Sequence, residues 1–228
     1  MKLIFSILLV YTILFASEDI TISSANNTLY EKFIFNDLIA NKNNFKTNNN
    51  HKLVNVYNLS KNDLLFLISS NSIDNSCHAC VSKMSWYHLK KENNNWQIVN
   101  KIVNVEPDYG SWGSFDIPEL IYIGKDKIAF KYIVSYSQQG ISGDKLDIQE
   151  YDNFKFKKIL TTEFGYSDSG VYEENEEHNN WESKMYIVKK DKPYYDIVIT
   201  KKGKKNQKEF EDNQIFKYIN GKYTLDKN

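Results

Sequence analysis

Residues 216–225 read FKYINGKYTL, and this stretch decides the fold class of the chain. Asn220 and Gly221 form the dipeptide most typical of a two-residue type I′ hairpin turn, in which both central residues take a positive φ. Runs that contain aromatic and aliphatic residues stand on both sides of this dipeptide. The stretch therefore predicts two antiparallel β-strands joined by a tight turn.

The same kind of pattern recurs earlier in the chain. Three units, at residues 52–103, 119–163 and 182–225, each contain two apolar runs joined by a short polar turn, a longer loop and two more runs. Alternation is clearest from Ile128 to Tyr136, where every second residue is apolar or aromatic. A unit of this kind cannot bury its own apolar face, so we expect the copies to pack on one another. The expected strands lie near residues 52–59, 64–69, 84–90, 96–103, 119–123, 127–136, 145–151, 154–162, 183–189, 194–201, 214–219 and 222–225.

These units predict an all-β protein made of three consecutive four-stranded antiparallel units, with residues 51–228 as a single β-domain. Propellers have roughly four to eight blades. Three units are therefore compatible with a propeller-like arc, or with sheets folded over one another as a sandwich or barrel, and the sequence leaves both arrangements open.

The N-terminal part differs from the rest. Residues 1–17 carry one lysine, an apolar stretch and a small-residue end, which predicts a secretory signal peptide and a periplasmic or secreted protein. The apolar stretch is shorter than the roughly 20 residues of a membrane span, so no span is expected after signal removal. Within residues 18–50, a Thr28–Glu31 capping box and an apolar stripe predict one short helix near 28–40, followed by an Asn/Lys-rich linker.

Charge composition limits the classes of partner. Lys plus Arg and Asp plus Glu both number 29, so no net field attracts nucleic acid, and no nucleic-acid partner is expected. All 29 basic residues are lysines. Without arginine, the chain lacks the bidentate guanidinium group that usually holds carboxylate or phosphate.

Cys77-His78-Ala79-Cys80 is the motif with the most obvious chemical potential. In an oxidising compartment, two such cysteines are expected to form a structural disulfide that pins one loop. A redox-active pair is the alternative, because a histidine between the cysteines favours the thiolate. A zinc site with His88 or His178 is a third interpretation, although the spacing of these residues is not typical of zinc ligands.

The connections between strands are expected to contain the binding residues. In a four-stranded meander, every second connection lies at the same end of the sheet, which here receives the segments 70–82, 106–118, 137–144, 164–180 and 202–213. Binding groups concentrate on loops held by a rigid scaffold. We therefore predict a binding surface that includes Trp112, Gln139 and Asp168.

Two of these segments have alternative interpretations. Trp112, between Gly110 and Gly113, can stack on a sugar or peptide, or can cover the end of the core. The acidic run at residues 173–177 is expected to be a solvated loop, with calcium binding together with Asp168 as the alternative.

The chain resembles uncharacterised exported proteins of Gram-negative bacteria in five segments: Cys-His-Ala-Cys, Gly110-Ser111-Trp112-Gly113, residues 136–140, Tyr195-Asp196-Ile197-Val198 and the terminal Tyr218–Tyr223 segment. The last unit is similar to a blade of FG-GAP-type propellers. Blades of that family usually carry a calcium loop, which this sequence lacks. The resemblance implies no activity.

Recognised catalytic motifs are missing from the sequence: it has no Gly-x-Ser-x-Gly, His-Glu-x-x-His, P-loop or dinucleotide fingerprint. We therefore expect a non-enzymatic recognition module of the inhibitor or immunity type, which binds an unknown protein or glycan and needs no metal or cofactor. The alternative is a thiol-disulfide redox protein that uses Cys77 and Cys80.

Overall fold

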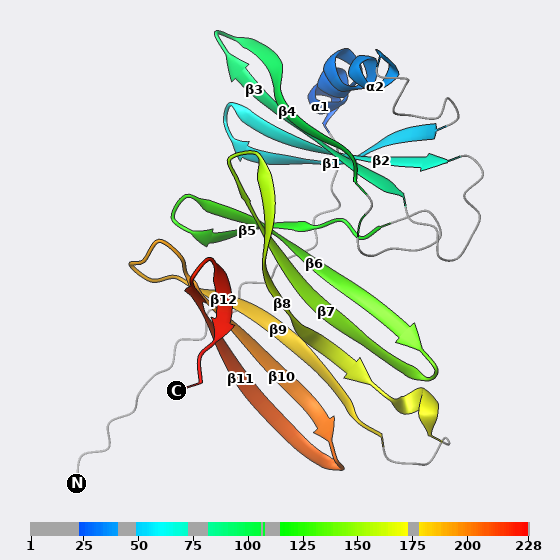
Figure 1. The fold of residues 1–228 in the computed structure, drawn as a ribbon, viewed down its shortest axis with the longest axis vertical. Coiled ribbons are helices and arrows are strands. Elements are labelled where there is room, and N and C mark those ends of the chain that lie inside the picture. Colours follow the sequence, from blue (N-terminus) through cyan, green and yellow to red (C-terminus); the bar gives the residue numbers. More distant parts are fainter. Residues whose placement is uncertain are drawn as a thin grey trace.

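The computed structural model describes residues 23–40, 49–72, 82–105, 107, 115–172 and 178–227. Figure 1 shows one helical segment and a series of β-strands in two sheets. The helical segment comprises α1 (Ser24–Leu29), a π-helical part (Tyr30–Phe35) and α2 (Asn36–Ala40). The strands are β1 (Asn49–Ser60), β2 (Asp63–Ser72), β3 (Lys83–Glu92), β4 (Asn95–Val105), β5 (Glu119–Gly124), β6 (Lys127–Gln138), β7 (Ile141–Asp152), β8 (Lys155–Ser167), β9 (Asn180–Val188), β10 (Asp196–Lys205), β11 (Lys208–Ile219) and β12 (Lys222–Leu225).

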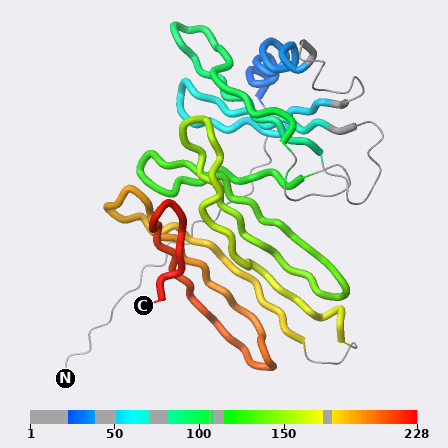
Figure 2. Tube along the Cα trace, viewed as in Figure 1, coloured from blue at the N-terminus to red at the C-terminus, as the bar shows by residue number. Residues whose placement is uncertain are grey.

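Each strand pairs in antiparallel fashion with the strand that follows it in sequence, apart from β4 and β5, which belong to different sheets. Strands β1–β4 form a four-stranded sheet, and β5–β12 form an eight-stranded sheet. In Figure 2 the colour runs from cyan in the smaller sheet through green and yellow to orange in the larger one, and the red β12 folds back toward β8. The predicted all-β class is confirmed. The division into three units is only partly confirmed, because the second and third units share one sheet.

That merger depends on a short junction between β8 and β9. Only three residue pairs join these strands: Gly165 with Glu182, Tyr166 with Trp181, and Ser167 with Asn180. Their neighbours form much longer ladders, such as the β6–β7 ladder from Ile128 to Gln138. The eight-stranded sheet therefore consists of two four-stranded halves joined near one end.

Two-residue turns with positive φ connect five of the hairpins. The predicted pair Asn220 and Gly221 has φ values of 51° and 83°, as a type I′ turn requires. The other turns with two positive φ values are Asn93–Asn94, Gln139–Gly140, Asn153–Phe154 and Asn206–Gln207. Asparagine tolerates this backbone region better than most residues do, which explains its position at four of these turns.

The four-stranded sheet is covered on both faces. On one face, Phe66 and Tyr87 pack with Ile34 and Leu38 of the helical segment. On the other face, Trp86 packs with residues of the eight-stranded sheet, including Phe130 and Tyr132. Because both faces are buried, residues 64–68 of β2 form a continuous apolar run rather than an alternating one. The result is three layers, with the helix and the larger sheet on opposite sides of the smaller one (Figure 1).

A second core lies within the eight-stranded sheet, because its two halves pack on each other. Leu146 and Ile148 of β7 join Ile197 and Ile199 of β10 in one buried cluster. The edge strand β5 also contacts the third unit, since the carbonyl of Ile123 accepts a hydrogen bond of 2.7 Å from the Tyr195 N–H. The sheet is therefore curled, although it is not closed into a barrel.

The helical segment begins earlier than the sequence pattern predicts. The Ser23 side chain accepts a hydrogen bond from the Asn26 N–H and caps α1, so the predicted capping box at Thr28 and Glu31 is wrong. Ser23 acts as the cap because its backbone is extended while its oxygen reaches the first helical turn. Within the described residues, no helix is long and apolar enough to cross a membrane.

Candidate functional site

Two rows of small and polar residues cross strands β6 to β9 on one face of the sheet. Pairing between the strands aligns Ser135, Asp144, Gly165 and Glu182 in the first row. The second row, one step closer to the strand ends, contains Ser137, Ser142, Ser167 and Asn180. Side chains two residues apart on a strand point to the same face, so both rows share one surface.

On each strand, one residue lies between the members of these two rows, and its side chain points to the opposite face of the sheet. These intervening residues form an aromatic row. It contains Tyr136, Tyr166 and Trp181, with Gly143 between the two tyrosines. A Cβ atom on Gly143 would lie 2.6 Å from the hydroxyl of Tyr136, so this ring needs a glycine beside it. The rings of Tyr166 and Trp181 stack with centroids 6.4 Å apart.

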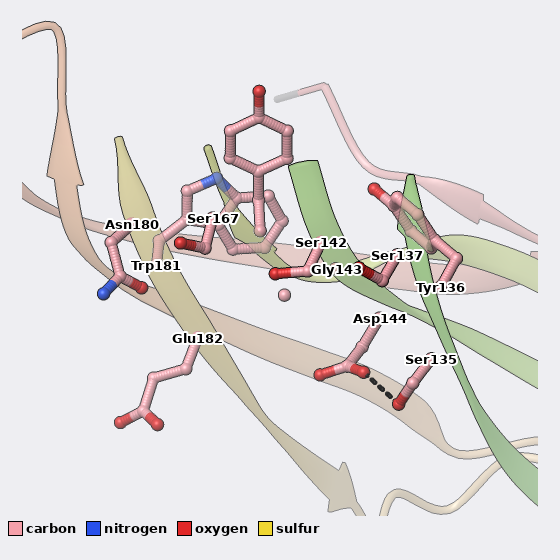
Figure 3. A pocket seen from close by; sticks show the side chains of 12 residues that line it. Ser135, Tyr136, Ser137, Ser142, Gly143, Asp144, Ser167, Asn180, Trp181 and Glu182 are labelled. Carbon is pink, nitrogen blue, oxygen red and sulfur yellow. Dashed lines mark hydrogen bonds between the residues drawn. The ribbon is translucent and has the colours of Figure 1, made fainter. Parts of the chain in front are cut away.

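Small side chains leave a groove of about 530 Å³ at this place, which we call the serine groove. Figure 3 shows the groove from close by, with Asp144 beside Ser135 and Glu182 extending from β9, two strands away from Asp144. Its volume falls within the roughly 300–1,000 Å³ that is common for ligand sites. It is a shallow, open depression rather than an enclosed cavity.

The serine groove has an acidic character. Its lining includes the carboxylates of Asp144 and Glu182 and contains no lysine or histidine. One oxygen of Asp144 accepts a hydrogen bond of 2.6 Å from Ser135, which fixes the orientation of the carboxylate. The remaining lining residues are four serines, one asparagine, two glycines and the three aromatic residues, whose side chains point to the opposite face. Such a surface favours a ligand that donates hydrogen bonds and carries a positive charge.

The groove adjoins the end of the sheet that the sequence analysis predicted as the binding surface. We call this end the rim and define it by the β6–β7 turn, the β8–β9 connection and the β10–β11 turn. Gln139 is exposed in the first of these and Asp168 lies in the second. A hydrogen bond of 3.1 Å from the Gly170 N–H to the Gly140 carbonyl joins these two parts of the rim. The structure therefore brings Gln139 and Asp168 to the same end of the sheet.

Asp168 has an internal structural role at the rim. Its side chain is buried and accepts hydrogen bonds of 2.7 Å from both the N–H and the side-chain amide of Asn179. Asn179 in turn accepts a hydrogen bond of 2.7 Å from the Asn206 N–H. Asp168 therefore joins the two described ends of the β8–β9 connection, and Asn179 joins them to the β10–β11 turn.

Several residues of the predicted site lie outside the part of the chain that the structure describes. These are Trp112, Cys77 and Cys80, together with the acidic run at residues 173–177. The disulfide, the redox pair and the tryptophan platform therefore stay predictions.

Two segments that were predicted as long loops are strands. Residues 137–144 form the end of one hairpin around Gln139 and Gly140, and residues 202–213 form the end of another around Asn206 and Gln207. Both segments extend past the apolar core, so they have no buried face to produce an apolar alternation. Strand pairing rather than burial keeps them extended.

His88 is one of the two histidines named in the alternative zinc interpretation of the cysteine motif, and both of its ring nitrogens have protein partners. Nδ1 lies 3.0 Å from the hydroxyl of Tyr151, and Nε2 lies 3.2 Å from Oδ1 of Asp63. A carboxylate only accepts hydrogen bonds, so Nε2 carries the proton and Nδ1 accepts from Tyr151. Burial lowers the pKa of His88, although Asp63 acts in the opposite direction. The histidine thus connects the two sheets in its neutral form.

Tyr151 has a perturbed pKa for the same reason. Burial raises the pKa of its hydroxyl to about 12, and the charge of Asp63 adds to the shift. The hydroxyl therefore remains a hydrogen-bond donor to His88 at neutral pH. Among the described residues, no three His, Cys, Asp or Glu side chains are grouped in a way that would hold a metal ion.

Sequence reasoning missed the serine groove, although one signal was present. The segment SYSQQGISGD at residues 135–144 alternates small residues around a turn dipeptide.

Comparison of the chain with known protein families, with curated proteins and with solved structures gives no match. The candidate site therefore depends on its own geometry.

Proposed function

We propose that this protein is an exported, non-enzymatic recognition protein that binds a positively charged, hydrogen-bond-donating segment of a partner in the serine groove. The observation that carries the proposal is the alignment of Asp144, Glu182 and four serines in two rows across four strands. The lining provides oriented acceptors and no cation, so a lysine side chain with neighbouring backbone N–H groups is complementary to it.

Rim residues support the same proposal. Gln139 is exposed two positions beyond Ser137, and Asp168 directly follows Ser167. Asp168 fixes the connection beside the groove, and Gln139 is free to contact a bound segment. Preorganisation of this kind reduces the ordering cost of binding.

Titration of the full chain with a short lysine-containing peptide tests the proposal, with the N-acetyl-lysine version of the same peptide as the control. Acetylation removes the charge and adds only a small acetyl group to the same side chain. We expect saturable binding of the lysine peptide and at least about tenfold weaker binding of the acetylated one, which corresponds to about 1.4 kcal/mol.

The matched variants are Asp144→Asn with Glu182→Gln in the groove, and Asp126→Asn with Asp191→Asn at exposed positions in the β5–β6 and β9–β10 connections. Each pair removes two negative charges, but only the first changes the groove. A single exposed ion pair contributes about 0–1 kcal/mol, so the groove pair is expected to weaken binding about tenfold. Equal weakening by both pairs would show that overall charge, and not the groove, attracts the peptide.

A further inference from the structure

A second hollow, of about 310 Å³, lies on strands β8 to β11 and shares only Tyr166 and Trp181 with the serine groove. We call it the lysine slot. It belongs to the opposite face of the sheet, because the rows that contain Tyr166, Trp181 and Lys201 alternate with the rows of the groove. The proposed function does not use it.

Pairing between the strands explains the shape of the slot. Gly203 pairs with Trp181 on one side and with Phe210 on the other. It contributes no side chain between these two aromatic residues, and a Cβ atom there would lie 2.1 Å from the Asn180 carbonyl oxygen. The position is therefore restricted to glycine, and the two aromatic residues become the walls of the slot.

Charged groups of both signs line the slot. Lys201 and Lys205 lie on β10, each two positions from Gly203 and on either side of it. Glu163 and Asp212 supply two carboxylates. Lys201 lies over the Trp181 ring, with its ammonium nitrogen 4.5 Å from the ring centroid. Burial lowers the pKa of Lys201, and the charges of Glu163 and Asp212 only partly oppose that effect. A partly desolvated ammonium group of this kind gains from an additional anion nearby.

Amide groups complete the lining. Asn206 and Gln214 border the slot and can each donate and accept hydrogen bonds. Gln214 donates to Asp212 at 3.0 Å, which orients that carboxylate. Acceptors of this kind suit hydroxyl groups, and aromatic walls suit the flat faces of a sugar ring.

We propose that the lysine slot binds an acidic sugar, in which a pyranose ring packs on Phe210 and beside the Trp181–Lys201 pair, and its carboxylate faces the Lys201 ammonium. The ring hydroxyls donate to Glu163 and Asp212. The slot volume is at the small end of the roughly 300–1,000 Å³ range of ligand sites, as a single sugar residue requires. The net charge of the four ionisable groups is zero, so recognition depends on the position of the charges and not on an overall attraction.

Calorimetric titration of the full chain with sodium glucuronate, glucose and benzoate tests this proposal. Glucose lacks the carboxylate and benzoate lacks the hydroxyls. We expect glucuronate to bind at least about tenfold more tightly than either compound. Equal binding of glucose or benzoate would overturn the proposal, and so would the absence of saturable glucuronate binding up to about 10 mM.

Variants locate the site. Lys201→Gln is expected to weaken glucuronate binding at least about tenfold, and Lys205→Gln, at an exposed position, about threefold. Lys202→Gln is the control, because Lys202 points to the other face and pairs with Glu211 at 3.8 Å. Thermal unfolding of each variant checks that the fold is kept, and Lys205→Gln remains informative if Lys201→Gln does not fold. The proposal would be rejected if both variants folded and bound glucuronate with the affinity of the wild type.

The groove and slot experiments fail independently. The groove pair Asp144→Asn with Glu182→Gln is expected to leave glucuronate affinity unchanged, because neither residue lines the slot. Loss of lysine-peptide binding with retained glucuronate binding would therefore separate the proposed function from the acidic-sugar site.

Discussion

The four-stranded sheet and the rim of the eight-stranded sheet both consist of antiparallel strands, but they differ in how far their side chains are buried. In the first, the helix and the larger sheet cover both faces, and residues such as Phe66, Leu67 and Tyr87 are fully buried. In the second, the strands extend past the core and carry serines, glycines and charged residues. The comparison shows that burial fixes the interior strands, whereas pairing and turn geometry fix the rim, which leaves its side chains free for binding.

Truncation of a core residue is expected to have the largest effect. Phe66→Ala removes a fully buried ring from the layer below the helix, and such changes cost about 3–5 kcal/mol. Urea unfolding measures the loss. The control is Tyr186→Ala, since this aromatic residue is 51% exposed and its loss should cost under about 0.5 kcal/mol. Similar losses in the free energy of unfolding at both positions would show that the two sheets do not differ in this way.

A backbone change at the rim is expected to have the next largest effect. Gly203→Ala forces a Cβ atom against the Asn180 carbonyl and the Trp181 backbone at a φ of 156°, and should cost about 1–3 kcal/mol. Gly221→Ala is the matched control at another positive φ, since its Cβ atom would meet only the flexible side chain of Lys157. Urea unfolding should show a smaller loss for the control. The reverse order would mean that close packing does not constrain the β9–β10 pair.

Removal of the Asp168 carboxylate should loosen the rim without unfolding the core. Asp168→Ala deletes two hydrogen bonds to Asn179 and is expected to cost about 1–2 kcal/mol. Hydrogen exchange should show faster exchange at the β8–β9 connection and the β10–β11 turn, and unchanged protection in β2 and β3. Asp126→Asn, in the exposed β5–β6 turn, is the control. Faster exchange throughout the molecule would show that the rim and the core do not behave separately.

Acid is expected to weaken the contact between the sheets, with the smallest effect of the four. Because burial depresses the pKa of His88 in the folded state, the unfolded chain binds the proton more readily. The contribution of this residue is complete above the ordinary histidine pKa of about 6.5 and declines as the pH falls through that value.

Comparison of His88→Gln with the wild type isolates this contribution. The stability of the wild type should fall more steeply between neutral and mildly acidic pH, by less than about 1.4 kcal/mol per pH unit, which is the limit for one proton. His51, whose pKa burial also lowers, is present in both proteins. Asp63, Tyr151 and Lys90 face His88 in both as well. Parallel pH curves would exclude His88 as the titrating group.

Sequence patterns predicted the interior better than the rim. Alternation from Ile128 to Tyr136 correctly placed Phe130 and Tyr132 on one buried face, because contact with a core selects apolar residues at every second position. Asn220 and Gly221 correctly predicted a hairpin, because their turn is a local property of the backbone.

Other features depend on contacts between distant residues and left no local pattern. The second and third units merge through three residue pairs at Gly165–Ser167, which no periodicity marks. The serine groove depends on the register of four strands, and serine is too common in loops to indicate a site. His88 looked isolated in the sequence, and its partner Tyr151 comes 63 residues later in the chain.

The meander order of the strands has a consequence for how the chain reaches its native state. Almost every ladder joins neighbours in sequence, so each hairpin can form as soon as its second strand is available, and little loop entropy is lost in the early steps. The contacts that join the two sheets, and the two halves of the larger sheet, span longer distances, as does the hydrogen bond from Tyr223 to the Ile123 carbonyl, 100 residues away. Nucleation is therefore local, and the slowest conformational step should be the docking of preformed hairpins.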